Sequence, residues 1–244
     1  GTPLDLASSF TLDDDPLELA HFLTEAGFLH VRGVFEREEM AVLSAEIDEW
    51  RNRVRPEDER AWMATVGHEQ VCVRVSDVGD ELAFPLAERL APIAAAARAG
   101  HRVGWTNLLV KPVGVSEGIS DLPWHKDCAL GMHSYKCQAI TCGTAVTASG
   151  PDNGQLGVVA GSHRVNIPLM DLSPTLDLPT IYLSTEPGDV TVHLSCVLHC
   201  STPPQHSERR VTYTDFSLPR DTAALDEKVK AVRVQAARET YAPT

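Results

Sequence analysis

Residues 188–216 read GDVTVHLSCVLHCSTPPQHSERRVTYTDF, two β-prone runs separated by a turn. The first run opens on a Gly-Asp pair and extends to His199, and the turn at 202–207 holds two adjacent prolines. The second run, 210–216, is rich in β-branched and aromatic residues. We expect the two runs to form neighbouring strands of one sheet.

Other short β-prone runs, punctuated by Gly, Pro and Asn, surround this stretch after residue 100. They lie at 105–111, 139–147, 157–159 and 180–183. Many short strands separated by turn residues are typical of a β-sandwich or barrel. The sequence shows neither the helix–strand alternation nor the Gly-rich phosphate loop of a nucleotide-binding sheet.

Before residue 100 the pattern is helical. Apolar residues recur at helical spacing in 16–25 and in 36–53, and 86–99 is rich in alanine. A short strand is expected at 28–31. The fold class predicted is therefore α+β, in one domain over residues 1–244: a helical front at about 13–100 and a sandwich or jelly-roll core at about 101–220.

Composition limits the partners of the protein. The 244 residues contain 21 Lys+Arg and 34 Asp+Glu, a formal net charge of −13, and Arg and Lys are scattered along the chain. Nucleic acid and anionic lipid would be repelled, so neither is expected to bind. No apolar run reaches the ~18 residues that a transmembrane helix needs.

The remaining compositional signals favour a cytoplasmic protein. The first residues lack the basic and then apolar order of a secretory signal. Six cysteines without a CxxC pair are too few for a disulfide scaffold in a chain of this length, and we expect them to be reduced. The sequence gives no indication of the oligomeric state.

A His-x-Asp pattern at His125 and Asp127 is the first sign of chemistry. In an extended strand these side chains point to the same face. His199, at the end of the run that begins at Gly188, is the best candidate for a second imidazole, and His193 is its nearest rival. Two imidazoles and one carboxylate form the facial triad of non-heme Fe(II) oxygenases, which leaves positions for a bidentate cosubstrate and for O2.

A cosubstrate such as 2-oxoglutarate carries a second carboxylate that requires a cation. Arg210 follows His199 by eleven residues, and a guanidinium can bind a carboxylate in bidentate fashion. Arg209 competes with it, and the spacing favours Arg210. Ser201 would add a hydroxyl hydrogen bond to the same carboxylate.

Five motifs, in order, resemble those of the phytanoyl-CoA dioxygenase family of Fe(II)/2-oxoglutarate-dependent oxygenases. Here they stand at Trp124 to Asp127, Asp152 to Leu156, Gly161 to Arg164, Gly188 to His199 with Ser201, and Arg210. The pattern from Ala26 to Phe35 is also similar to that family's opening. Each motif is weak alone, but the ordered set covers residues 17–216.

The resemblance implies a double-stranded β-helix (jelly-roll, cupin-like) core flanked by the N-terminal helices. It implies that His125, Asp127 and His199 bind iron and that Arg210 anchors 2-oxoglutarate. Asn107 and Thr141, on neighbouring strands, are further candidates for contact with the cosubstrate. Related halogenases carry a small residue at the position of Asp127, so halogenation is not expected.

The function expected is therefore oxidation of an unactivated C–H bond in a small organic molecule, such as a natural-product intermediate. Hydroxylation is the default outcome, and epimerisation, cyclisation or desaturation are variants of the same chemistry. Two alternatives remain: a cupin-like protein that binds metal or ligand without turnover, and a zinc hydrolase with the same three ligands. Substrate contacts are expected from residues 62–74, 114–121 and 166–186.

Overall fold

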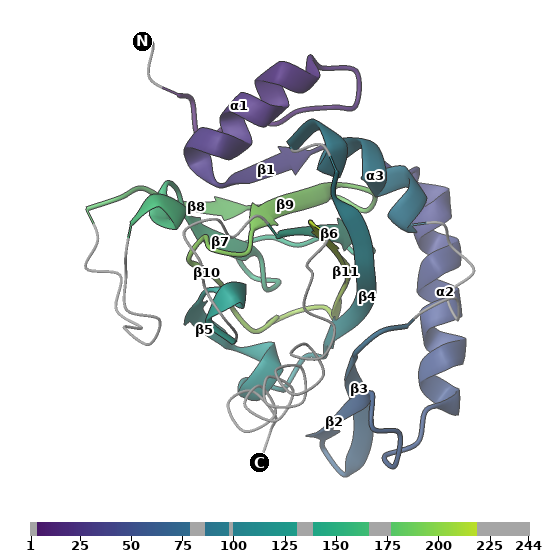
Figure 1. Ribbon diagram of the computed structural model, residues 1–244. Helices are drawn as coiled ribbons and strands as arrows, with labels where there is room; N and C mark the ends of the chain where they lie inside the picture. Colours follow the sequence, from purple (N-terminus) through teal and green to yellow (C-terminus); the bar gives the residue numbers. More distant parts are fainter. Residues whose placement is uncertain (1–3, 79–85, 98–99, 131–138, 166–176, 219–244) are drawn as a thin grey trace, which may run out of the picture.

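The computed structural model describes residues 4–78, 86–97, 100–130, 139–165 and 177–218. Two antiparallel sheets face each other around a shared interior, with the helices outside them (Figure 1). This arrangement confirms the predicted jelly-roll core with flanking N-terminal helices.

The described residues contain three α-helices: α1 (Pro16–Ala26), α2 (Arg37–Arg53) and α3 (Leu86–Ala97). The Asp15 carboxylate caps α1 by accepting a hydrogen bond from the backbone N–H of Leu17 at 2.9 Å, and Gly27 ends this helix with a φ of 86°. All three helices occupy the stretches where the helical periodicity predicted them. Within the described residues, no helix combines the length and apolar character needed to cross a membrane.

The larger sheet has seven strands in the order β1-β9-β6-β11-β4-β3-β2. Their bounds are β1 (Phe28–Val31), β2 (Ala61–Val66), β3 (Glu69–Val75), β4 (Arg102–Lys111), β6 (Ile140–Ala145), β9 (Val190–Leu194) and β11 (Arg209–Ser217). The hairpin of β2 and β3, which the sequence analysis did not predict, extends this sheet beyond β4 (Figure 1).

The expectation that the run beginning at Gly188 would pair with 210–216 is wrong. β6 lies between β9 and β11 and pairs with both. The first run also divides in two, because β9 ends at Leu194 and His199 begins a strand of the other sheet. A change of sheet within one β-prone run depends on long-range pairing and leaves no local sequence signal.

The smaller sheet has four strands in the order β5-β10-β7-β8. They are β5 (Leu122–His125), β7 (Leu156–Val159), β8 (Thr180–Leu183) and β10 (His199–Ser201). β10 is therefore flanked by β5 and β7, which holds its side chains in place from both sides.

Alternation along the strands gives the larger sheet two different faces. Leu108, Val110 and Phe216 pack in one apolar cluster with the buried residues of the helices, such as Met40 and Ile47. Residues one position away on the same strands point to the opposite face, toward the smaller sheet. That inner face carries the polar side chains that form the site.

Candidate metal and cosubstrate site

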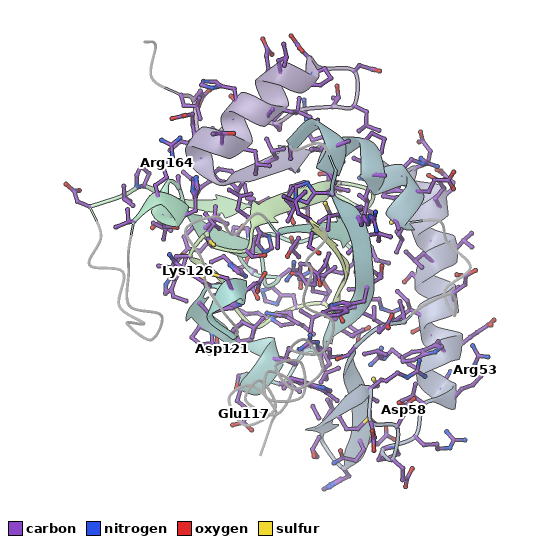
Figure 2. The ribbon with its side chains drawn as sticks, in the orientation of Figure 1. Arg53, Asp58, Glu117, Asp121, Lys126 and Arg164 are labelled. Atoms are coloured by element: carbon purple, nitrogen blue, oxygen red, sulfur yellow. The ribbon has the colours of Figure 1, made fainter. Side chains whose placement is uncertain are left out.

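Two histidines of the smaller sheet lie directly opposite each other. His125 ends β5, His199 begins β10, and the two residues are register partners. Their ring centroids are 4.2 Å apart, and both side chains are buried. Side chains from both sheets fill the interior between them (Figure 2).

Asp127 completes the cluster from a turn. It begins the 3-10 helix η3 (Asp127–Leu130). The strand periodicity had predicted instead that Asp127 would continue β5. Its Oδ1 lies 3.7 Å from Nε2 of His125 and 3.5 Å from Nε2 of His199. All three potential ligand atoms lie within 4.8 Å of one another. Lys126, between the two ligand candidates in sequence, instead donates from Nζ to the Ser162 carbonyl at 3.2 Å.

Backbone carbonyls fix the orientation of both imidazoles. Nδ1 of His125 lies 2.7 Å from the carbonyl oxygen of Pro123, and Nδ1 of His199 lies 3.0 Å from that of Val197. Since a carbonyl only accepts, each Nδ1 carries the hydrogen and each Nε2 presents a lone pair to the cluster. This is the arrangement that a metal-binding histidine requires.

The electrostatics of the cluster also suit a cation. Burial lowers the pKa of His125 to about 4, so this ring is neutral near pH 7. Burial opposes ionisation of Asp127, but the charge and hydrogen bonds of His199 and His193 outweigh it and hold the pKa of this carboxyl well below its usual range. Burial opposes protonation of His199, but the charge of Asp127 outweighs it and raises the pKa of this ring above its usual value. A divalent metal needs a neutral imidazole, so metal binding at His199 would release the proton that Asp127 stabilises.

His193 contacts the other oxygen of Asp127. His193 lies on strand β9, and its Nε2 donates to Oδ2 at a distance of 3.2 Å. Its ring centroid is 4.4 Å from that of His199. The sequence analysis named His199 and His193 as rival candidates for the second imidazole. Their positions separate them: His125 and His199 face Oδ1, whereas His193 holds Oδ2.

Thr141 links Asp127 to a second carboxyl group. Its hydroxyl lies 3.2 Å from Oδ2 of Asp127 and 3.1 Å from Oδ1 of Asp215. One hydroxyl hydrogen serves only one of these acceptors, so the second contact needs a proton on a carboxyl group. Burial and then the charge of Asp127 raise the pKa of Asp215 to about 7, so Asp215 is the carboxyl that carries it.

We expect Asp215→Asn to change how the stability of the metal-free protein depends on pH. The pKa of Asp215 is raised from 3.8 to about 7, so the folded state binds more protons than the unfolded chain across that interval. Stability therefore falls as pH rises through it, by up to ~4 kcal/mol for this group. Urea unfolding at about pH 5 and about pH 8 should show a smaller fall in the variant. Equal falls in both proteins would refute the raised pKa.

The structure corrects the prediction for Arg210. Its guanidinium binds α2 on the outer face: Nη1 donates to the Ser44 carbonyl at 2.8 Å, and Nη2 pairs with Asp48 at 2.6 Å. Nε also pairs with Glu208 at 2.7 Å. Because neighbouring residues of a strand point to opposite faces, Arg209, the rival candidate, is the arginine directed into the interior.

Arg209 and Lys111 form a pair of buried cations on the inner face. They are register partners on β11 and β4, and they are 5% and 0% exposed. Nη1 of Arg209 has no hydrogen-bond partner, and within the described ranges neither cation has an ion pair. Burial, and then the charge of Arg209, holds the pKa of Lys111 well below its usual value. Nζ of Lys111 already donates to the carbonyls of Ser120, Ser201 and Thr202 and to the Ser201 hydroxyl. The unused donor of this site is therefore Nη1 of Arg209, which suits an anion.

Ser201 joins this cationic site to the histidine cluster. It lies two residues beyond His199 on β10, so the two side chains share a face about 7 Å apart along the strand. Its hydroxyl accepts from Nζ of Lys111 at 2.6 Å, which leaves its own hydrogen to donate. A five-carbon dicarboxylate bound at one end to the cluster would place its other carboxylate here.

Gly154 explains the turn motif noted in the sequence. It has a φ of 72°, and a Cβ there would lie 2.8 Å from the Thr202 carbonyl oxygen and 3.5 Å from Cδ of Arg209. Only glycine lets this loop pack over the arginine.

Asn107 is held by a backbone group, and its contact with the cosubstrate stays a prediction. Its Oδ1 accepts from the backbone N–H of Asp77 at 3.2 Å, and it is the register partner of Tyr213. Asp77 has a φ of 61°, so the amide of Asn107 holds a backbone conformation that few residues adopt. The hydrogen bond connects β4 to the segment that follows β3.

A jelly-roll interior with two histidines, one carboxylate and a buried cationic site defines the class of non-heme iron oxygenases. The phytanoyl-CoA dioxygenase (PhyH) family profile matches residues 23–211, and the chain belongs to this family. It is therefore an Fe(II)/2-oxoglutarate-dependent oxygenase, with Fe(II), 2-oxoglutarate and O2 as its cofactor and cosubstrates.

Solved structures share the fold. AviO1 from Streptomyces viridochromogenes Tue57 is 23% identical with a TM-score of 0.68, over 84% of this chain and 96% of that one. The epimerase SnoN in complex with Fe3+, alpha ketoglutarate and nogalamycin RO is 24% identical (TM-score 0.64; 84% and 85% covered). The carbocyclase SnoK from nogalamycin biosynthesis is 19% identical (TM-score 0.68; 92% and 93% covered). Among curated proteins, none matches the sequence.

Proposed function

We propose that the protein oxidises a C–H bond of a small natural-product intermediate at an iron bound by His125, Asp127 and His199. The observation that carries this proposal is the convergence of two Nε2 lone pairs and one carboxylate oxygen within 4.8 Å. The similarity of the fold to SnoN and SnoK, which are described as enzymes of nogalamycin biosynthesis, favours this substrate class. Hydroxylation is the default outcome, and epimerisation or cyclisation are its variants.

The protein's own groups would perform three tasks. The first is to orient the metal ligands: the Pro123 and Val197 carbonyls orient the two imidazoles, and His193 and Thr141 hold the second oxygen of Asp127. When bound, Fe(II) with 2-oxoglutarate and O2 supplies the oxidising power for C–H cleavage.

The second task is to bind and orient the cosubstrate. We propose that Arg209 and Ser201 bind the distal carboxylate of 2-oxoglutarate, and that Lys111 holds the Ser201 hydroxyl in place by donating to it. The unpartnered Nη1 of Arg209 and the remaining hydroxyl hydrogen of Ser201 supply two donors for it. The third task is to exclude water, which the apolar neighbours Leu109 and Val211 on the same inner face favour.

Anaerobic addition of Fe(II), with and without 2-oxoglutarate, tests the proposal. We expect a weak visible charge-transfer band that needs both components, and O2-dependent conversion of 2-oxoglutarate to succinate once it has formed. If Fe(II) binds but no band appears, the cosubstrate assignment fails, and a metal-binding protein without turnover becomes the better description. Product analysis with candidate substrates then separates hydroxylation from epimerisation and cyclisation.

A further inference from the structure

A second arginine faces the interior, and its guanidinium has no hydrogen-bond acceptor among the residues that the structure describes. Arg74 is half-buried near the end of β3, where its register partners are Trp62 of β2 and Leu109 of β4. Its guanidinium carbon lies 4.6 Å from the centroid of the Trp62 ring. Across the described parts of the chain, no hydrogen bond or ion pair involves the Arg74 guanidinium.

Trp62 adds a second unused donor at the same place. Its side chain is 5% exposed, and its indole Nε1 is buried without a hydrogen-bond partner among the described residues. A buried N–H without an acceptor is costly, and a half-buried guanidinium without a counter-ion is costlier. Two neighbouring donors with this deficit indicate an acceptor that is supplied by a ligand.

The electrostatics place this pair on the side of the iron site. Burial lowers the pKa of the Arg74 guanidinium, and the charges of Asp127 and Asp215 oppose this shift, although neither carboxylate is hydrogen-bonded to Arg74. The Asp215 carboxyl is hydrogen-bonded to Thr141 and to the Trp105 side chain, so its hydrogen bonds are used elsewhere. Arg74 is therefore near the iron site. It is separate from the Arg209–Lys111 site, where Arg209 and Ser201 supply the donors for the cosubstrate.

We propose that Arg74, with Trp62, forms a subsite for a carboxylate group of the substrate. The inference rests on the proposed function, because it places the substrate beside the iron. Stacking on Trp62 fixes the plane of the guanidinium and leaves its edge to bind a carboxylate with two parallel hydrogen bonds. An acidic chain with a net charge of −13 repels anionic molecules at long range, so a local cation is needed to select one.

The experiment uses 3-phenylpropanoate and its neutral amide as probes. Their dissociation constants are measured by calorimetry with metal-free protein and with protein loaded with Fe(II) and 2-oxoglutarate. The proteins are wild type, Arg74→Gln, Arg74→Lys and, as a matched control, Arg53→Gln. Arg53 is exposed at the end of α2 (Figure 2).

We expect wild type and Arg53→Gln to bind the acid more tightly than the amide. In Arg74→Gln the dissociation constant of the acid should rise by at least about 30-fold. Arg74→Lys should recover part of the loss, since it restores the charge without the planar fork. Equal binding of the acid by wild type and Arg74→Gln, or no saturable binding of the acid by wild type, overturns the proposal.

Affinity for 2-oxoglutarate separates this inference from the proposed function. We expect the visible band of Arg74→Gln to form at the same 2-oxoglutarate concentration as in wild type. A loss of 10-fold or more in 2-oxoglutarate affinity, by this band, assigns Arg74 to the cosubstrate and overturns the substrate subsite. If wild type forms no band, the proposed function fails, while the binding of the acid to metal-free protein still decides the role of Arg74.

Discussion

Replacing Arg209 by glutamine should raise the 2-oxoglutarate concentration for half-saturation by ~100-fold, equivalent to ~2.7 kcal/mol of binding free energy. Arg209 is 5% exposed, and its Nη1 has no protein partner among the described residues. The loss of a charged, desolvated donor is costly because the bound carboxylate would then lack its counter-ion. The visible band of the Fe(II) protein, titrated with 2-oxoglutarate without O2, measures the change.

Arg210→Gln is the matched control for this prediction. Its guanidinium binds Ser44 and Asp48 of α2 and Glu208, all on the outer face. We expect its 2-oxoglutarate affinity to stay within about 3-fold of wild type, because the side chain faces away from the interior. Its unfolding free energy should fall by about 1 kcal/mol, the value of partly exposed ion pairs. A large loss of 2-oxoglutarate affinity in Arg210→Gln, with affinity retained in Arg209→Gln, would restore Arg210 as the anchor.

The two arginines show where sequence reasoning stops. The eleven-residue spacing from His199 favoured Arg210, and either arginine could serve by residue type. The choice depends on which side of β11 faces inward, which follows from pairing with β4 and β6. A one-residue difference in the turn reverses the face of every side chain after it. Two adjacent arginines give no local signal of that choice.

The triad was predictable for the opposite reason. His125 and Asp127 are close in sequence, and His199 had the Ser201 context that marks it. Their clustering needs only the pairing of β5 with β10. Even so, the strand argument placed Asp127 wrongly, on β5, because it could not foresee that the chain turns into η3 after Lys126.

Residues with tertiary roles left weaker signals. Lys111 was only the last residue of a predicted strand, and its burial depends on β11 placing Arg209 beside it. Asp215 was one polar residue in a β-prone run, and its contact with Thr141 requires the pairing of β11 with β6. A charged residue at an inward position of an otherwise apolar strand is the one signal that could have found either residue.

Asp127→Ala should abolish Fe(II)-dependent turnover, a loss of at least about 10³-fold, because two imidazoles alone hold a divalent ion weakly. The variant should also lose stabilisation by metal. In wild type, a metal that binds only the folded state raises the unfolding temperature as its concentration rises, and the variant should show no such rise. The matched control is Asp152→Ala, which removes an exposed carboxylate in the same half of the chain and should behave as wild type.

The same substitution has a consequence that separates loss of a ligand from loss of the fold. The charge of Asp127 helps to raise the pKa of Asp215 and outweighs burial in raising that of His199. Without it, both pKa values should fall, and NMR titration of the metal-free variant should show His199 neutral to a lower pH. A variant that still binds Fe(II) as wild type does, with the His199 pKa lowered, would contradict Asp127 as a ligand. It would leave Asp127 with an electrostatic role only.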